Sequence, residues 1–191
     1  MSNTPFAQAL TELTVALEHA GIRYFVGGSI ASVLHGEVRT THDVDIVVDL
    51  RAEHVAPLTA ALAPTFFAED EALRWAIAHH SSCNIIHRAT ALKIDLFLLR
   101  RRAFSSAEMD RRCGAEVIAG ITMPVATAED CVLTKLEWFR KGGEVSDRQW
   151  RDVLGVLHVK RGQLDEARLD AWAERLGVAD LLERAREEAG D

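Results

Sequence analysis

Hydrophobic residues near the N-terminus recur at the spacing of a helix. Thr4 and Pro5 are typical of a helix start, as an N-cap followed by proline at the first helical position. The apolar residues that follow share one helical face: Phe6, Leu10, Leu13 and Leu17. This stripe predicts an amphipathic helix that packs on a larger apolar surface.

Short apolar and β-branched runs follow, and they predict strands and intervening helices. The predicted strands lie at residues 22–26, 44–49, 83–88, 92–99 and 116–125, the last of these being one strand or two around Gly120. The predicted helices lie at residues 30–36, 52–62 and 70–79. Because the run at 44–49 is apolar apart from its acids, we expect it inside the sheet. The runs at 83–88 and 92–99 are separated by a three-residue link and predict a hairpin.

The C-terminal third reads as helix throughout. The predicted helices there lie at residues 127–141, 147–161, 165–176 and 178–188, and Gly142-Gly143 separates the first two. We therefore predict an α/β (α+β) fold. Residues 1–125 are expected to form a mixed sheet flanked by helices, and residues 126–191 a helical extension packed on that core.

Composition and charge narrow the class of protein. The 191 residues are 48% hydrophobic and 27% charged, which is typical of a folded domain rather than a disordered chain. The net charge of −7 gives no general attraction to nucleic acid. Three widely spaced cysteines indicate reduced thiols. With no signal peptide and no apolar run of about 20 residues, we expect a cytoplasmic protein without membrane contact.

A pair of aspartates in the second predicted strand is the strongest chemical feature. Asp43 and Asp45 are two residues apart, so on a strand both carboxylates point to the same face. Asp95 is a further acid within an apolar run. If the two strands are neighbours, three carboxylates converge where Mg²⁺ or Mn²⁺ would offset their repulsion. Alone, Asp-x-Asp is also typical of turn caps and solvated sheet edges; Asp49 is interpreted as a cap of the next helix.

A glycine-rich turn is the second feature. Gly27, Gly28 and Ser29 follow a predicted strand and precede a predicted helix. Glycines allow a ligand to approach the backbone closely, and a helix N-terminus presents N–H groups to an anion. The alternative is a tight turn that Ser29 merely caps. The patterns of P-loop and dinucleotide-binding proteins are absent from this segment.

The whole segment GGSIASVLHGEVRTTHDVDIVVD resembles the nucleotidyltransferase superfamily of DNA polymerase β. The resemblance implies that Gly27, Gly28 and Ser29 bind the nucleotide phosphates and that Asp43, Asp45 and Asp95 hold the metal. Asp95 would also activate the incoming hydroxyl. Over the full length, the helical end is similar to the bacterial minimal and abortive-infection-toxin (AbiEii-like) nucleotidyltransferases.

This narrower resemblance extends the expected nucleotide site. Lys135 has apolar helical neighbours, so it is expected to face the core, and it is assigned a catalytic and nucleotide-binding role; a stem that carries its ammonium out to water is the alternative. Asp152 is expected to orient Lys135, or else to pair with Arg148 on its own helix. Arg39 and Thr41, immediately before the acids, are expected to touch nucleotide.

Several functions fit these residues. The first is transfer of a nucleoside monophosphate (NMP) from a nucleoside triphosphate (NTP), such as ATP, to a hydroxyl of RNA, protein or a small molecule, with release of pyrophosphate. As a toxin, such an enzyme would have a cognate antitoxin as its partner. The second is a noncatalytic module that binds nucleotide or a partner. A metal-dependent phosphohydrolase is the third, although such enzymes normally need histidine ligands.

Overall fold

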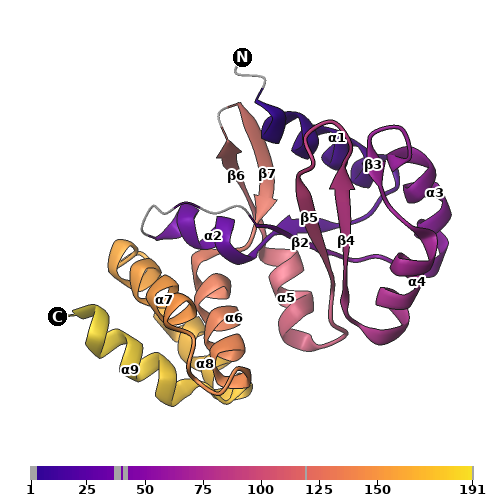
Figure 1. The fold of residues 1–191 in the computed structure, drawn as a ribbon. Helices are drawn as coiled ribbons and strands as arrows, with labels where there is room; N and C mark the ends of the chain where they lie inside the picture. The colour runs from indigo at the N-terminus through magenta and orange to yellow at the C-terminus, as the bar shows by residue number, and fades with distance from the viewer. Residues whose placement is uncertain (1–3, 37–39, 41–42, 119, 191) are drawn as a thin grey trace. The chain divides into compact units, whose positions relative to one another are not determined.

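The computed structural model describes residues 4–36, 40, 43–118 and 120–190 (Figure 1). It confirms the predicted fold class, because a mixed seven-stranded sheet with flanking helices is followed by a helical C-terminal part. The chain forms two compact units. One comprises Met1–Val26 and His42–Val125, and the other comprises Gly27–Thr41 and Ala126–Asp191.

All strands of the sheet belong to the first unit. They are β1 (Tyr24–Val26), β2 (Val44–Val48), β3 (Phe66–Phe67), β4 (Ser82–His87), β5 (Lys93–Leu98), β6 (Cys113–Ile118) and β7 (Ile121–Val125). Their order across the sheet is β3-β4-β5-β2-β1-β7-β6. The predicted hairpin is confirmed as antiparallel β4 and β5, and β2 lies inside the sheet between β5 and β1.

The two faces of the central strands differ in burial. Along β2, Val44, Ile46 and Val48 are buried, whereas Asp45 and Val47 are only partly buried. β5 alternates in the same way, with Ile94, Leu96 and Leu98 buried. Side chains alternate between the faces of a strand, so one face carries the core and the other carries the acids.

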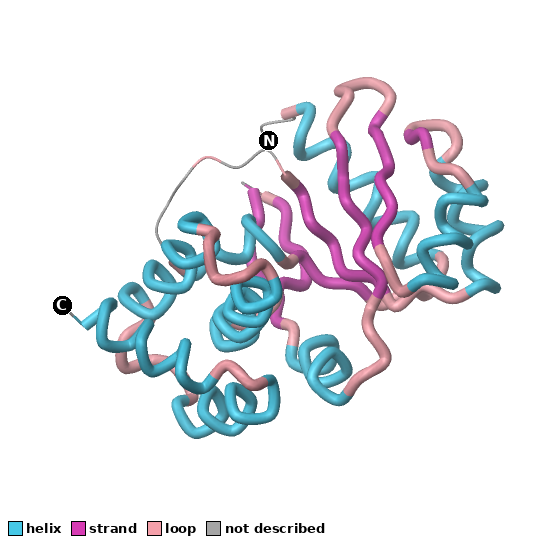
Figure 2. The backbone as a smooth tube through the Cα atoms, turned by 60° about the horizontal axis from the view of Figure 1, so that its bottom comes forward, coloured by secondary structure: helices cyan, strands magenta, loops and turns pink. Residues whose placement is uncertain are grey.

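Among the described residues, the first unit contains four helices. They are α1 (Pro5–His19), α3 (Ala52–Leu62), α4 (Asp70–His79) and α5 (Ala103–Arg111). Contacts of α1 with α3, of α3 with α4 and of α4 with β4 join three of them into one layer beside the strands (Figures 1 and 2). Thr4 caps α1 as predicted, because its hydroxyl accepts from the Ala7 N–H at 3.2 Å.

Two details of the first unit correct the sequence-based interpretation. Asp49 does not cap α3, whose N-cap is Arg51; its carboxylate instead accepts from Arg23 at 3.0 Å. Helix α5 lies in a segment where no element is predicted. Its buried side chains include Ser105 and Glu108 beside Phe104 and Met109, so polar residues interrupt the apolar stripe.

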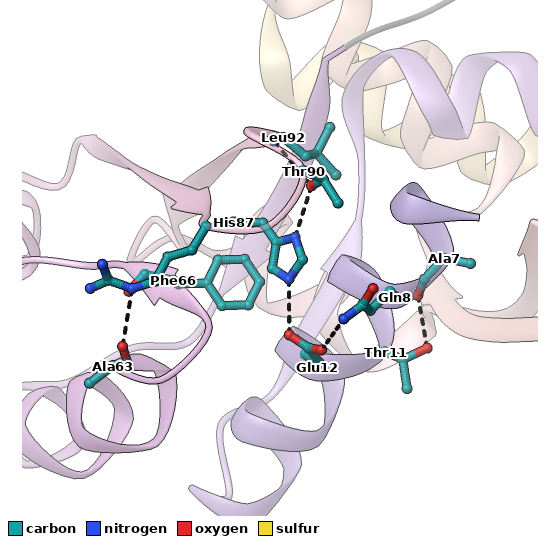
Figure 3. Close-up of polar contacts among 10 residues, drawn as sticks. Ala7, Gln8, Thr11, Glu12, Ala63, Phe66, His87, Thr90 and Leu92 are labelled. Atoms are coloured by element: carbon teal, nitrogen blue, oxygen red, sulfur yellow. Dashed lines mark hydrogen bonds and ion pairs between the residues drawn. The ribbon is translucent and has the colours of Figure 1, made fainter. Parts of the chain in front are cut away.

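A buried histidine joins the helical layer to the hairpin (Figure 3). His87 in β4 is almost fully buried, and its Nε2 lies 3.0 Å from a Glu12 carboxylate oxygen on α1. Its Nδ1 lies 2.8 Å from the Thr90 hydroxyl, which also accepts from the Leu92 N–H at 3.3 Å. Both ring nitrogens are therefore satisfied, as a buried polar side chain requires. The ring also packs against Phe66, with the centroids 5.0 Å apart.

The second unit is helical. It contains α2 (Gly28–His35), α6 (Ala128–Lys141), α7 (Asp147–Val159), α8 (Glu166–Leu176) and α9 (Ala179–Gly190). Helix α7 is in contact with α2, α6 and α9. At the end of α2, a Cβ on Gly36 would lie 2.9 Å from the Val156 backbone nitrogen, so α7 approaches too closely for any larger residue. No helix in the described parts of the chain is long and apolar enough to cross a membrane.

Candidate active site

The first unit places two acids side by side on neighbouring strands, with a third acid directly before one of these strands. Asp45 in β2 is the register partner of Asp95 in the parallel strand β5, and Asp43 precedes β2 by one residue. Neighbouring strands lie about 4.8 Å apart, so the Asp45 and Asp95 side chains are adjacent on the same face of the sheet. The sequence-based expectation that the strands of these acids are neighbours is therefore met.

A lysine that the sequence analysis did not consider lies among these acids. The Lys93 ammonium donates to both carboxylate oxygens of Asp95, at 2.8 and 3.1 Å. The pKa of Lys93 is raised, first by this hydrogen bond and then by the negative charges of Asp95, Asp43 and Asp45. The signal was available in the sequence, because Lys93 precedes Asp95 by two residues and so shares its face of the strand.

The three acids are not gathered into a closed metal site. Within the described residues, no three histidine, cysteine, aspartate or glutamate side chains are placed to hold a metal ion together. Asp95 is paired with Lys93, and the convergence of the three carboxylates on one ion stays a prediction. The donor set itself suits a hard divalent cation such as Mg²⁺, which prefers carboxylate oxygens.

In the second unit, the glycine turn leads directly into α2. Gly27 is the N-cap, and Gly28 begins the helix with a φ of +52°, a left-handed conformation that favours glycine. Ser29 is buried and is the second residue of the helix, so it is not the cap that the alternative interpretation required. Its hydroxyl accepts from Arg148 of α7 at 2.9 Å. From the sequence, Arg148 is expected only as an alternative partner of Asp152.

A buried ion pair joins α6 and α7 in the same unit. Lys135 Nζ donates to Asp152 Oδ2 at 2.6 Å, and their side chains are 9% and 6% exposed. Lys135 therefore faces the core, and its ammonium meets a carboxylate rather than bulk water. Asp152 is positioned to orient it, as the sequence analysis expected. Burying two charges is costly unless they are paired and hydrogen-bonded, which accounts for the short contact.

Two of the expected nucleotide ligands cannot be placed. Arg39 and Thr41 lie outside the described residues. Of the other expected site residues, the structure brings Asp45 and Asp95 into register within the first unit. Within the second it joins Ser29 to Arg148, and Lys135 to Asp152.

The fold is that of nucleotidyltransferase-like proteins. An antigenic nucleotidyltransferase-like protein from Paracoccidioides brasiliensis matches with a TM-score of 0.53 at 15% identity, over 93% of this chain and 91% of that one. ANT(2")-Ia, solved in complex with adenylyl-2"-tobramycin, matches with a TM-score of 0.53 at 12% identity, over 91% and 98% of the two chains. No family model and no curated protein matches the sequence. At these identities the similarity is one of fold.

Proposed function

We propose that this chain is a metal-dependent nucleotidyltransferase, which moves an NMP from an NTP to a hydroxyl and releases pyrophosphate. One observation carries the proposal: Asp45 and Asp95 are register partners in the adjacent strands β2 and β5, both partly buried, and Asp43 directly precedes β2. Neighbouring carboxylates repel one another, and a bound cation or proton offsets this repulsion. The fold shared with nucleotidyltransferase-like structures supports the same class of reaction.

Each group of residues has a proposed task. Asp43, Asp45 and Asp95 would hold Mg²⁺ or Mn²⁺, which when bound would neutralise charge on the phosphate oxygens. Asp95 would also accept the proton of the attacking hydroxyl. The turn of Gly27, Gly28 and Ser29 would donate to phosphate oxygens from its N–H groups and hydroxyl, as a helix N-terminus can. Arg39 and Thr41 remain proposed nucleotide ligands.

The buried pair of Lys135 and Asp152 has a proposed role beside phosphate. Asp152 fixes the Lys135 ammonium in one position at 2.6 Å, and a positioned cation stabilises charge that develops on a transferred phosphoryl group. Arg148, which already donates to Ser29, would add a second cation near that turn.

The hydroxyl that accepts the NMP belongs to one of three chemical classes: RNA, protein or a small molecule. ANT(2")-Ia is bound to an adenylylated small molecule in its complex, and this favours a small hydroxyl compound as the first acceptor to test. The toxin role and a cognate antitoxin are further proposals that rest on the sequence resemblance. A cytoplasmic location is a further proposal that rests on the widely spaced cysteines.

Label transfer tests the proposed reaction. The protein is incubated with each α-labelled NTP, Mg²⁺ or Mn²⁺, and separate pools of RNA, protein and small hydroxyl compounds. We expect label on one pool and release of pyrophosphate, both lost in Asp45→Asn and Asp95→Asn and on chelation of the metal. Asp70→Asn, an exposed acid of α4, is the matched control and should retain activity.

Two other outcomes would assign a different function. NTP binding without transfer to any pool would identify a noncatalytic nucleotide-binding module. Release of free phosphate in place of pyrophosphate would identify a phosphohydrolase, and either result would overturn the proposal.

A further inference from the structure

A second site lies in the first unit, at the opposite ends of the strands that carry the acids. A cavity of about 830 Å³ is lined by the ends of β2 and β5, and by the starts of α3 and α5. Asp45 lies four residues before Asp49 of this cavity, a separation of about 13 Å along an extended strand. The cavity is therefore distinct from the face that carries Asp43, Asp45 and Asp95.

Arginine dominates the lining of this cavity. Five of the residues that line it are arginines: Arg23, Arg51, Arg100, Arg101 and Arg102. Only two lining residues are acidic, Asp49 and Glu53. The cavity is thus strongly basic within a chain whose net charge is −7, so the cations are locally concentrated.

Two of the lining arginines, Arg23 and Arg51, lie beside acids that fix their positions. Arg23 donates to Asp49 and to Asp110, each at 3.0 Å, and Arg51 lies 4.0 Å from Asp49. These pairs hold the start of β1 against the end of β2. The consecutive arginines 100–102 lie between β5 and α5, where they line the cavity beside the start of α5.

The helix starts at the cavity add to its attraction for anions. Helices α3 and α5 begin at Ala52 and Ala103, which both line the cavity, and neither N-cap arginine makes a side-chain cap. The first N–H groups of a helix have no partner within the helix and favour negative charge. The two alanines leave room for a ligand to approach this backbone.

The lining also indicates the kind of anion. In the described structure, no phenylalanine, tyrosine or tryptophan lines the cavity, so it offers no platform on which a base would stack. Its volume falls in the usual range for small-molecule sites, about 300–1,000 Å³. Guanidinium groups pair with phosphate oxygens in bidentate fashion.

We propose that this arginine cavity binds a small polyphosphate anion, at a site separate from the proposed transfer site. The ligand class is a molecule with two or more linked phosphates, recognised through its phosphate groups rather than through a base. The inference does not depend on the proposed transferase activity.

Binding of inorganic triphosphate, measured by calorimetry on the full chain, tests this site. Chelator is included so that no divalent ion can bring triphosphate to the acids. We expect saturable binding that Arg100→Gln/Arg101→Gln weakens about tenfold or more, as loss of charge-assisted hydrogen bonds implies. Arg51→Gln should weaken it too, whereas Arg74→Gln, an exposed arginine of α4 outside the cavity, should change it less than twofold.

Circular dichroism and thermal unfolding identify any variant that has lost its fold, and Arg101→Gln alone, at an exposed position, supplies a mild alternative. The proposal is overturned if the wild-type chain does not bind triphosphate, or if folded cavity variants bind it unchanged. Loss of binding in Asp45→Asn would place the signal at the acids and would also overturn it. If single-stranded RNA displaces triphosphate at a lower concentration of phosphate groups than triphosphate itself requires, the ligand of the cavity is RNA, and the proposal of a small ligand is overturned.

Discussion

At the scale of single residues, the candidate site is organised by charge pairs that sequence spacing reveals only in part. The expected pairing of the two acid-bearing strands is observed, because Asp45 and Asp95 are register partners in β2 and β5. Periodicity did not predict which charged side chain each of these residues contacts. Lys93 binds Asp95, and Arg148 binds Ser29, because rotamers and neighbouring elements decide which of several nearby charges meet.

Replacing Lys93 should strengthen metal binding. The Lys93 ammonium occupies both oxygens of Asp95, so a divalent ion must compete with it for that carboxylate. We expect Lys93→Gln to lower the dissociation constant for Mn²⁺ by about three- to tenfold, as removal of a nearby like charge implies. Calorimetric titration with Mn²⁺ measures this change.

A second lysine variant separates the local effect from a change in net charge. Lys160→Gln removes the same charge from the end of α7 and should leave the Mn²⁺ affinity nearly unchanged. Equal or weaker Mn²⁺ binding in Lys93→Gln would mean that Lys93 supports the site rather than competing for it.

At the scale of elements, periodicity predicted the long segments well and the short or interrupted ones poorly. The predicted helices at 52–62 and 70–79 coincide with α3 and α4, whose apolar positions repeat cleanly. Strand β3 has two residues, too few for any period, and α5 buries Glu108 and Ser105 among its apolar side chains. Periodicity reports only the pattern of apolar residues, so it fails where polar groups are buried with partners.

Helix α2 supplies a pH-dependent contribution to stability. The His35 ring lies 2.7 Å from the Ala126 carbonyl, to which Nε2–H donates. Burial is the largest effect on the pKa of His35 and lowers it below its usual 6.5, and the Lys160 charge lowers it further. The hydrogen bond to Ala126 and the Glu129 charge act in the opposite direction. The unfolded chain therefore takes up this proton first as pH falls. Stability from His35 is present above about pH 6.5 and decreases below it.

Urea unfolding at several pH values tests this dependence, followed by tryptophan fluorescence, to which Trp138, Trp150 and Trp172 of the same unit contribute. The free energy of unfolding should fall between about pH 7.5 and pH 5.5, and it should fall less in His35→Gln, which can still donate to the carbonyl. Parallel pH profiles for the two proteins would show that the pKa of the His35 ring is the same in the folded and the unfolded chain, which would contradict this prediction.

At the scale of the whole molecule, the chain passes between its two units more than once. The second unit takes Gly27–Thr41 from within the N-terminal part, together with Ala126–Asp191. Helix α2 is in contact with α6 and α7, so residues 1–125 include an element whose partners lie beyond residue 125. Apolar periodicity locates elements, but it does not say which ones share a core, and so a division of the sequence at residue 125 stays a prediction.

Truncation at residue 125 tests whether the predicted N-terminal core folds alone. In the fragment of residues 1–125, Ile30 and Ala31 of α2 would lose the helices that bury them, and Gly36 would lose its close contact with α7. Exposure of buried apolar groups costs about 25 cal/mol per Å², so we expect α2 to unfold and the fragment to have less helix than the intact chain. Circular dichroism and amide exchange measure this loss. Co-expression of residues 126–191 should restore protection of α2, whereas a fragment that already protects α2 by itself would contradict the shared core of α2, α6 and α7.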